Sequence, residues 1–168
     1  MATHYSNHFH AGGTTVTTRA AGHIPAGGLN GERCLVSTAY TKALSLTTDT
    51  GRVLRGIPSN ARIHLFWVSA DDASAAGAFN VGVHQTEENG GAVVAADLFC
   101  TALAKNANAE SFFEAGAALR LADRGKLLWE ILGLTVDPQR SYDITYTPST
   151  SFTTTALGIS MTLIYSLG

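Results

Sequence analysis

The segment LADRGKLLWEILGLTVDPQRSYDITYT, residues 121–147, contains a helix signal, a stop signal and a strand signal in succession. Its apolar positions recur at spacings of four, three and four, which is typical of one face of a helix. This stripe consists of Leu121, Gly125, Leu128 and Leu132. Gly133 is placed to end the helix in a left-handed conformation, and Asp137-Pro138 prevents its resumption. We therefore predict one short helix of about three turns over 121–132.

The two faces of this helix differ in character. Lys126 and Glu130 lie opposite the stripe, where we expect water, and Trp129 lies at the edge of the stripe. Gly125 on the stripe allows the helix to lie close to a sheet. After the stop, apolar and polar residues alternate over 142–146, which predicts a β-strand.

The rest of the chain alternates in the same way between glycine-rich turns. Strand patterns begin at Cys34 and recur at 62–68, 79–84 and 157–166. The segment 93–104 is ambiguous, because it fits either a strand or a helical turn. Strands that recur every ten to fifteen residues indicate a mainly β protein. We predict an antiparallel β-sandwich, jelly-roll-like, with one short helix.

The composition limits the classes of function. The chain has 168 residues and a net charge of −2, and its charged fraction of 14% is below the roughly 25% of an average domain. Its basic residues are scattered, which argues against binding to nucleic acid or to an anionic membrane. No apolar run approaches the roughly 20 residues of a membrane span. The N-terminus has no signal-peptide pattern. A surface so poor in charge favours a protein that works within an assembly.

The first 31 residues differ from the rest in being rich in Gly, His, Thr and Ala. We predict an extended N-terminal arm over 1–31 and a single sandwich domain over 32–168. Within the arm, five consecutive residues have β-propensity and little to bury. They are Thr14, Thr15, Val16, Thr17 and Thr18. One interpretation is that they add a strand to a neighbouring subunit, and the other is a frayed terminus.

The histidines and cysteines do not form a recognisable site. His4, His8 and His10 have a spacing that suits a transition metal if the arm folds back, although a polar arm packed on a partner fits the same residues. Cys34 and Cys100 are far apart in sequence. We interpret them as small buried hydrophobic residues and leave their pairing open. This usage is typical of a reducing cytoplasm.

Other candidate sites have equally simple structural interpretations. Asp71-Asp72 and Glu87-Glu88 suit calcium or an acid–base pair, but they also suit solvated turns. His64 and His84 have no nucleophile motif beside them. An aromatic shelf for a sugar is one interpretation of three residues, and packing of a helix on a sheet is the other. These residues are Trp129, Tyr142 and Tyr146. We predict no catalytic, cofactor or metal site, and no enzymatic activity.

The C-terminal motifs resemble a known family. Residues 126–134, KLLWEILGL, are followed by Asp137-Pro138 and by the strand that begins Tyr142-Asp143-Ile144. This order resembles the C-terminal pattern of small virion structural proteins of tailed bacteriophages, in which an LWELLGL-like helix leads to a DP turn and a YDI strand. Residues 95–99, AADLF, are similar to an AADxF stretch upstream of that helix. The resemblance covers roughly residues 60–168.

The resemblance implies a non-enzymatic head protein without a cofactor. We expect a decoration or cement protein that binds the major capsid protein and stabilises the shell. It is expected on the capsid exterior of the virion, after assembly in the host cytoplasm, as a homo-oligomer such as a trimer or a ring. It would have no direct contact with nucleic acid or membrane. The alternative is a phage tail or surface module that binds a carbohydrate or a receptor.

Overall fold

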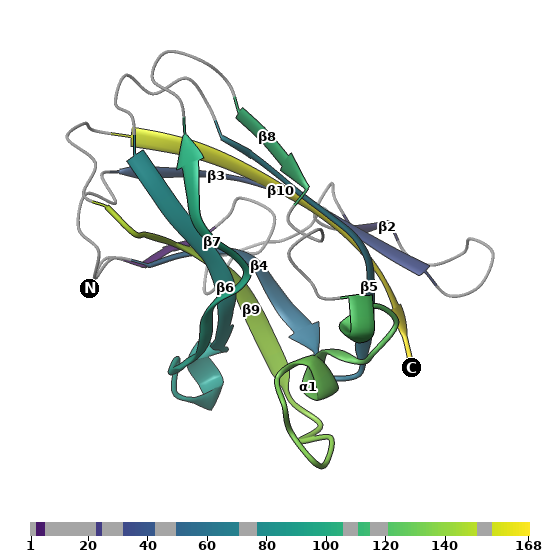
Figure 1. The fold of residues 1–168 in the computed structure, drawn as a ribbon. Coiled ribbons are helices and arrows are strands. Elements are labelled where there is room, and N and C mark those ends of the chain that lie inside the picture. The colour runs from purple at the N-terminus through teal and green to yellow at the C-terminus, as the bar shows by residue number, and fades with distance from the viewer. Residues whose placement is uncertain are drawn as a thin grey trace.

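The chain folds into two sheets that pack face to face in a computed structural model (Figure 1). The structure describes residues 3–5, 23–24, 32–42, 50–70, 77–105, 111–114, 121–150 and 156–168. Each sheet contains five strands over these residues. Antiparallel pairing dominates, and the antiparallel sandwich predicted from the sequence is confirmed.

The first sheet, sheet A, has its strands in the order β1-β4-β9-β6-β7. Their bounds are β1 Thr3–Tyr5, β4 Thr50–Pro58, β9 Ser141–Pro148, β6 Gly77–Gln85 and β7 Val93–Lys105. The short β1 pairs with β4 in parallel, whereas β4, β9, β6 and β7 pair antiparallel. The segment 93–104, ambiguous in the sequence, is therefore strand.

The second sheet, sheet B, has its strands in the order β2-β3-β10-β5-β8. Their bounds are β2 His23–Ile24, β3 Glu32–Lys42, β10 Ala156–Leu167, β5 Ala61–Ala70 and β8 Ser111–Glu114. Successive strands often belong to different sheets, so the chain crosses repeatedly between the two layers. As a result, each sheet is built from segments that are distant in sequence.

The core lies between the two sheets and follows the predicted alternation. On β10, the buried residues are Ile159, Met161, Leu163 and Tyr165. Phe66 of sheet B meets Phe99 of sheet A edge to face, with 4.8 Å between ring centroids. Offset aromatic contacts of this kind add to the stabilisation from buried apolar area. This contact joins the two layers.

The predicted helix is present but much shorter than expected. A 3-10 turn, η4, covers Leu121–Asp123, and the helix α1 covers Leu128–Ile131 only. Between them Gly125 has a φ of +86° and is exposed, so the three-turn helix with a buried Gly125 is wrong. A left-handed residue cannot continue a right-handed helix.

Both ends of α1 are satisfied by local hydrogen bonds. At its start, the side chain of Glu130 accepts a hydrogen bond from the backbone N–H of Leu127 at 2.7 Å. At its end, Gly133 has a φ of +74°, and the N–H of Leu134 donates to the carbonyl of Trp129 at 3.1 Å. The predicted left-handed cap at Gly133 is confirmed. The N–H of Trp129 donates to the Ser59 carbonyl at 3.0 Å, which docks α1 on the turn between β4 and β5.

The predicted arm lies mostly outside the described residues. Two of its segments are described, and both are edge strands, because β1 lies beside β4 and β2 lies beside β3. Thr14–Thr18 are not among the described residues, and their role as an inter-subunit strand stays a prediction. The division into 1–31 and 32–168 also stays a prediction. None of the helices found in the described residues is long and apolar enough to span a membrane.

Candidate functional site

Among the described residues, a group of interacting charged side chains lies on the face of sheet A that points away from the core. Three neighbouring strands contribute to it: β4 provides Arg52, β9 provides Asp143 and β6 provides His84. The register places Asp143 opposite His84, and Thr145 opposite Arg52. Asp143 has no exposed surface, and the other residues of this polar cluster are also buried. The strand predicted over 142–146 is confirmed as part of β9, and every residue of this segment is buried.

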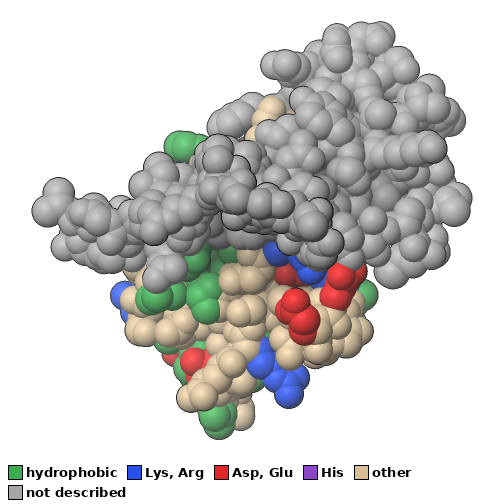
Figure 2. All heavy atoms as spheres, turned by 180° about the vertical axis from the view of Figure 1, so that it is seen from behind, with side chains coloured by type: hydrophobic (Ala, Val, Ile, Leu, Met, Phe, Trp, Pro, Cys, Tyr) green, Lys and Arg blue, Asp and Glu red, His purple; other side chains and the backbone are tan. Residues whose placement is uncertain are grey.

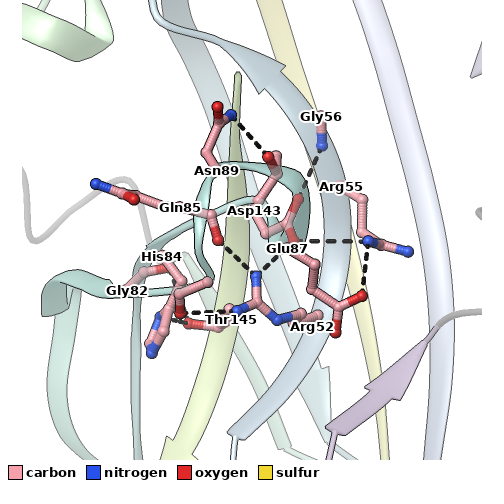
Figure 3. A network of polar contacts seen from close by, with 12 residues as sticks. Arg52, Arg55, Gly56, Gly82, His84, Gln85, Glu87, Asn89, Asp143 and Thr145 are labelled. Atoms are coloured by element: carbon pink, nitrogen blue, oxygen red, sulfur yellow. Dashed lines mark hydrogen bonds and ion pairs between the residues drawn. The ribbon is translucent and has the colours of Figure 1, made fainter. Parts of the chain in front are cut away.

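Asp143 is the centre of the cluster, and its carboxylate has three partners (Figure 3). One oxygen lies 2.7 Å from Nη1 of Arg52 and 3.5 Å from Nε of Arg55. The other oxygen accepts a hydrogen bond from the backbone N–H of Gly56 at 3.1 Å. Such charge-assisted hydrogen bonds are stronger than neutral ones, and they offset part of the cost of burying the charges.

Arg52 connects this carboxylate to the turn between β6 and β7, residues 86–92. Its Nη1 donates to the carbonyl of Gln85 at 2.7 Å, and its Nη2 donates to the carbonyl of Gly91 at 3.0 Å. Glu87 of the same turn pairs with Arg55 at 3.6 Å. This turn contains the 3-10 helix η2, Glu87–Asn89. The two arginines thereby hold the turn against the outer face of sheet A.

His84 lies beside the ion pair and is held neutral. Its Nδ1 is 2.8 Å from the hydroxyl of Thr145. Burial, followed by the nearby positive charge of Arg52, lowers the pKa of His84 to about 4. The imidazole is therefore uncharged near neutral pH. A buried group with so low a pKa is poorly suited to general acid–base catalysis at pH 7.

A surface depression at the β4–β5 turn shares no lining residue with this cluster. This shallow depression of about 340 Å³ is lined by Pro58, Ser59, Asn60, Asp137, Gln139, Arg140 and Ser141. Ser59 of this depression is 2% exposed, and its hydroxyl donates to Asp137 and accepts the N–H of Arg140. These bonds join the β4–β5 turn to the segment before β9. The arrangement fits a structural role better than nucleophilic catalysis.

The residues singled out in the sequence do not converge on one site. No group of three or more His, Cys, Asp or Glu residues suited to a metal occurs among the described residues. Glu88 is exposed on the η2 turn, and Glu87 is paired with Arg55. Asp71-Asp72, His8 and His10 lie outside the described residues, and the side chain of His4 does as well.

The aromatic shelf is not formed. Tyr142 and Tyr146 belong to the core and expose 4% and 0% of their surface, whereas Trp129 is half-buried on α1. Cys100 is a free thiol, so a bond between it and Cys34 is not present. Burial raises the pKa of Cys100 to about 11, which keeps its thiol protonated and unreactive.

Sequence reasoning missed the polar cluster, although a signal for it was present. Asp143 places a charge between the apolar residues Tyr142 and Ile144 of a strand, and Arg52 and Arg55 flank the apolar pair Val53-Leu54. Charged residues that interrupt apolar strands are typical of buried ion pairs, because such residues are rarely buried alone. The pairing of Arg52 with Asp143 spans 91 positions and depends on the sheet register.

The comparisons with known proteins bear on the fold through one solved structure. No protein-family model matches the chain, and no curated protein matches it. A solved structure described as "Cyanophage Pam1 capsid asymmetric unit" is similar, with a TM-score of 0.50 and 14% sequence identity. The similarity covers 94% of this chain and 99% of that chain. At this identity the likeness concerns the architecture, and it extends over nearly all of both chains.

Proposed function

We propose that the protein is a structural component of a bacteriophage capsid. The observation that carries this proposal is the fold shared with a chain of a cyanophage capsid over 94% of this chain and 99% of that one. The resemblance of residues 126–144 to small virion structural proteins supports the same assignment from the sequence. The two arguments rest on different properties, one on the course of the backbone and the other on a run of side chains.

Within the capsid, we propose the role of a decoration or cement protein that binds the major capsid protein and stabilises the shell. The buried ion pairs support this role, because they fix surface turns to the sheets. A protein that bridges neighbours needs rigid contact surfaces, since ordering a mobile loop on binding reduces affinity. We infer no enzymatic function. With Tyr142 and Tyr146 in the core, no feature of the described surface favours the alternative of a carbohydrate-binding module.

The experiment that tests this role uses heads of a phage whose copy of the gene has been deleted, so that the heads lack the protein. Purified full-length protein is added to these heads, and bound copies are counted after sedimentation. We expect saturable binding with a fixed number of copies per head, and greater retention of DNA on heating. Heads that bind no protein, or that are equally heat-stable with and without it, would contradict the proposal. Bovine serum albumin at the same concentration serves as the control for trapping in the pellet.

A further inference from the structure

Two exposed places on the described surface combine apolar and charged side chains. Large apolar residues are exposed at Val93, Leu134, Val136 and Leu167. Val136 is 74% exposed in the loop between α1 and β9, and Val93 is 56% exposed at the start of β7. These two segments lie on different sides of the same end of the sandwich (Figure 1). Single exposed apolar residues are common, so their charged surroundings decide what they can bind.

The first place, which we call the loop surface, is basic. It consists of Arg62, Arg124, Leu134, Val136 and Arg140, all of them exposed. Backbone contacts hold its parts together, because Arg62 forms a bridge with Leu127, and the carbonyl of Arg140 accepts the N–H of Ser59 at 2.7 Å.

The carboxylates near the loop surface are engaged locally. Asp123 pairs with Lys126 at 2.7 Å, and Glu130 accepts the N–H of Leu127 at 2.7 Å. Asp137 accepts the N–H of Gln139 at 2.8 Å. The three arginines of the loop surface make no such ion pair with described residues, so their guanidinium groups are available to a partner.

The second place, which we call the turn surface, is acidic. It consists of Glu88, Val93 and Asp97, which follow one another along the β6–β7 turn and the start of β7, and all are exposed. Their neighbour Glu87 is already paired with Arg55. From behind, acidic side chains lie close together on one side of the described surface, and apolar side chains lie on the other side and at the tip (Figure 2).

We propose that the loop surface of one copy of this chain binds the turn surface of a second copy. The loop surface offers Leu134 and Val136 together with arginines, and the turn surface offers Val93 together with carboxylates, so the charges are opposite in sign. Surface charges contribute little affinity but select the partner and its orientation, while apolar contacts supply the binding energy. Because the two surfaces differ, the contact is heterologous and repeats into a ring or an open chain. The inference rests on the proposed function, for which it names the homo-oligomeric contact.

The test is the molar mass of the full-length protein in solution, measured by light scattering after gel filtration. At low salt we expect oligomers that dissociate towards monomers at about 1 M salt, where charges are screened beyond about 3 Å. The reversals R124E/R140E and E88K/D97K should each weaken association by on the order of tenfold or more, because like charges then face each other. Glu114 is exposed on β8 outside both surfaces, so E114K is the matched control and should leave the mass unchanged.

Mixing the two reversed variants provides the decisive measurement. In the mixture, the natural loop surface of one variant can bind the natural turn surface of the other. The two reversed surfaces again carry charges of opposite sign, so an equimolar mixture should recover the oligomer. Monomeric wild-type protein at low salt, unchanged masses for both variants, or a mixture that stays monomeric would overturn the inference. Attachment to heads that lack the protein is measured separately. Monomers that attach would overturn this contact alone, whereas oligomers that do not attach would overturn the proposed function alone.

Discussion

Asp143 is a carboxylate without solvent exposure that faces two guanidinium groups, at 2.7 Å and 3.5 Å. Removing one partner of a buried ion pair costs more than the pair contributes, because the remaining charge stays buried without compensation. We therefore expect D143N to lower the free energy of unfolding by about 3–5 kcal/mol, as measured by urea denaturation. K126A, which breaks the exposed pair with Asp123, is the control and should cost less than about 1 kcal/mol. Equal effects of the two variants would contradict the buried network.

His84 gives a second prediction, for the dependence of stability on pH. Its pKa of about 4 in the folded protein is below its ordinary value of 6.5, so between these pH values the unfolded chain binds a proton that the folded chain does not. Stability contributed by the neutral imidazole is full above pH 6.5 and is lost as the pH falls towards 4, by about 1.4 kcal/mol per pH unit.

The variant H84Q lacks this titration. The difference in unfolding free energy between wild type and H84Q should therefore change across pH 6.5 to 4 and stay constant from pH 7 to 8. The measurement is urea denaturation of both proteins at several pH values, with the difference cancelling the titration of the carboxylates that they share. A constant difference over the whole range would show that His84 is protonated normally in the folded protein.

At the scale of elements, α1 shows what the periodicity of apolar residues predicts and what it does not predict. The spacing of Leu128 and the cap at Gly133 were sufficient to place a helix and its end. The same spacing wrongly included Gly125, because apolar periodicity shows which positions share a face of a helix and carries no information on the sign of φ. The strand 142–146 shows a similar limit. Alternation placed Asp143 on the polar face, but the burial of that face depends on a turn about 50 residues earlier in the chain.

Glycine substitutions distinguish the observed turn from a continuous helix. In a helix over 121–132, G125A would stabilise the protein by up to about 1 kcal/mol. With a φ of +86° at Gly125, the added Cβ instead costs roughly 1–2 kcal/mol. We expect this loss in urea denaturation, with a similar loss for G133A at +74°. G125N should recover part of the stability, because asparagine tolerates left-handed backbone better than alanine. A gain in stability for G125A would contradict the observed conformation.

At the scale of the whole molecule, composition and turn spacing were sufficient to predict an antiparallel sandwich. They did not predict the strand order, since pairs such as β4 with β9 join segments about 90 residues apart. The first residues of the chain also join the sheets, because β1 extends sheet A and β2 extends sheet B. A free arm over the whole of 1–31 therefore requires a test in which folding and attachment are read separately.

Deletion of residues 2–31 provides this test. The buried core described here comes from residues 53–165, and removal of β1 and β2 leaves four strands in each sheet. We expect cooperative thermal unfolding with a modest loss of stability, together with weaker attachment to heads that lack the protein. Replacing Thr14–Thr18 by glycine and serine is the matched control, since it preserves chain length and both edge strands but removes β-propensity. If this replacement weakens attachment as much as the deletion does, the five residues carry the contact. Full attachment of the deleted protein would show that the arm has no part in binding the capsid.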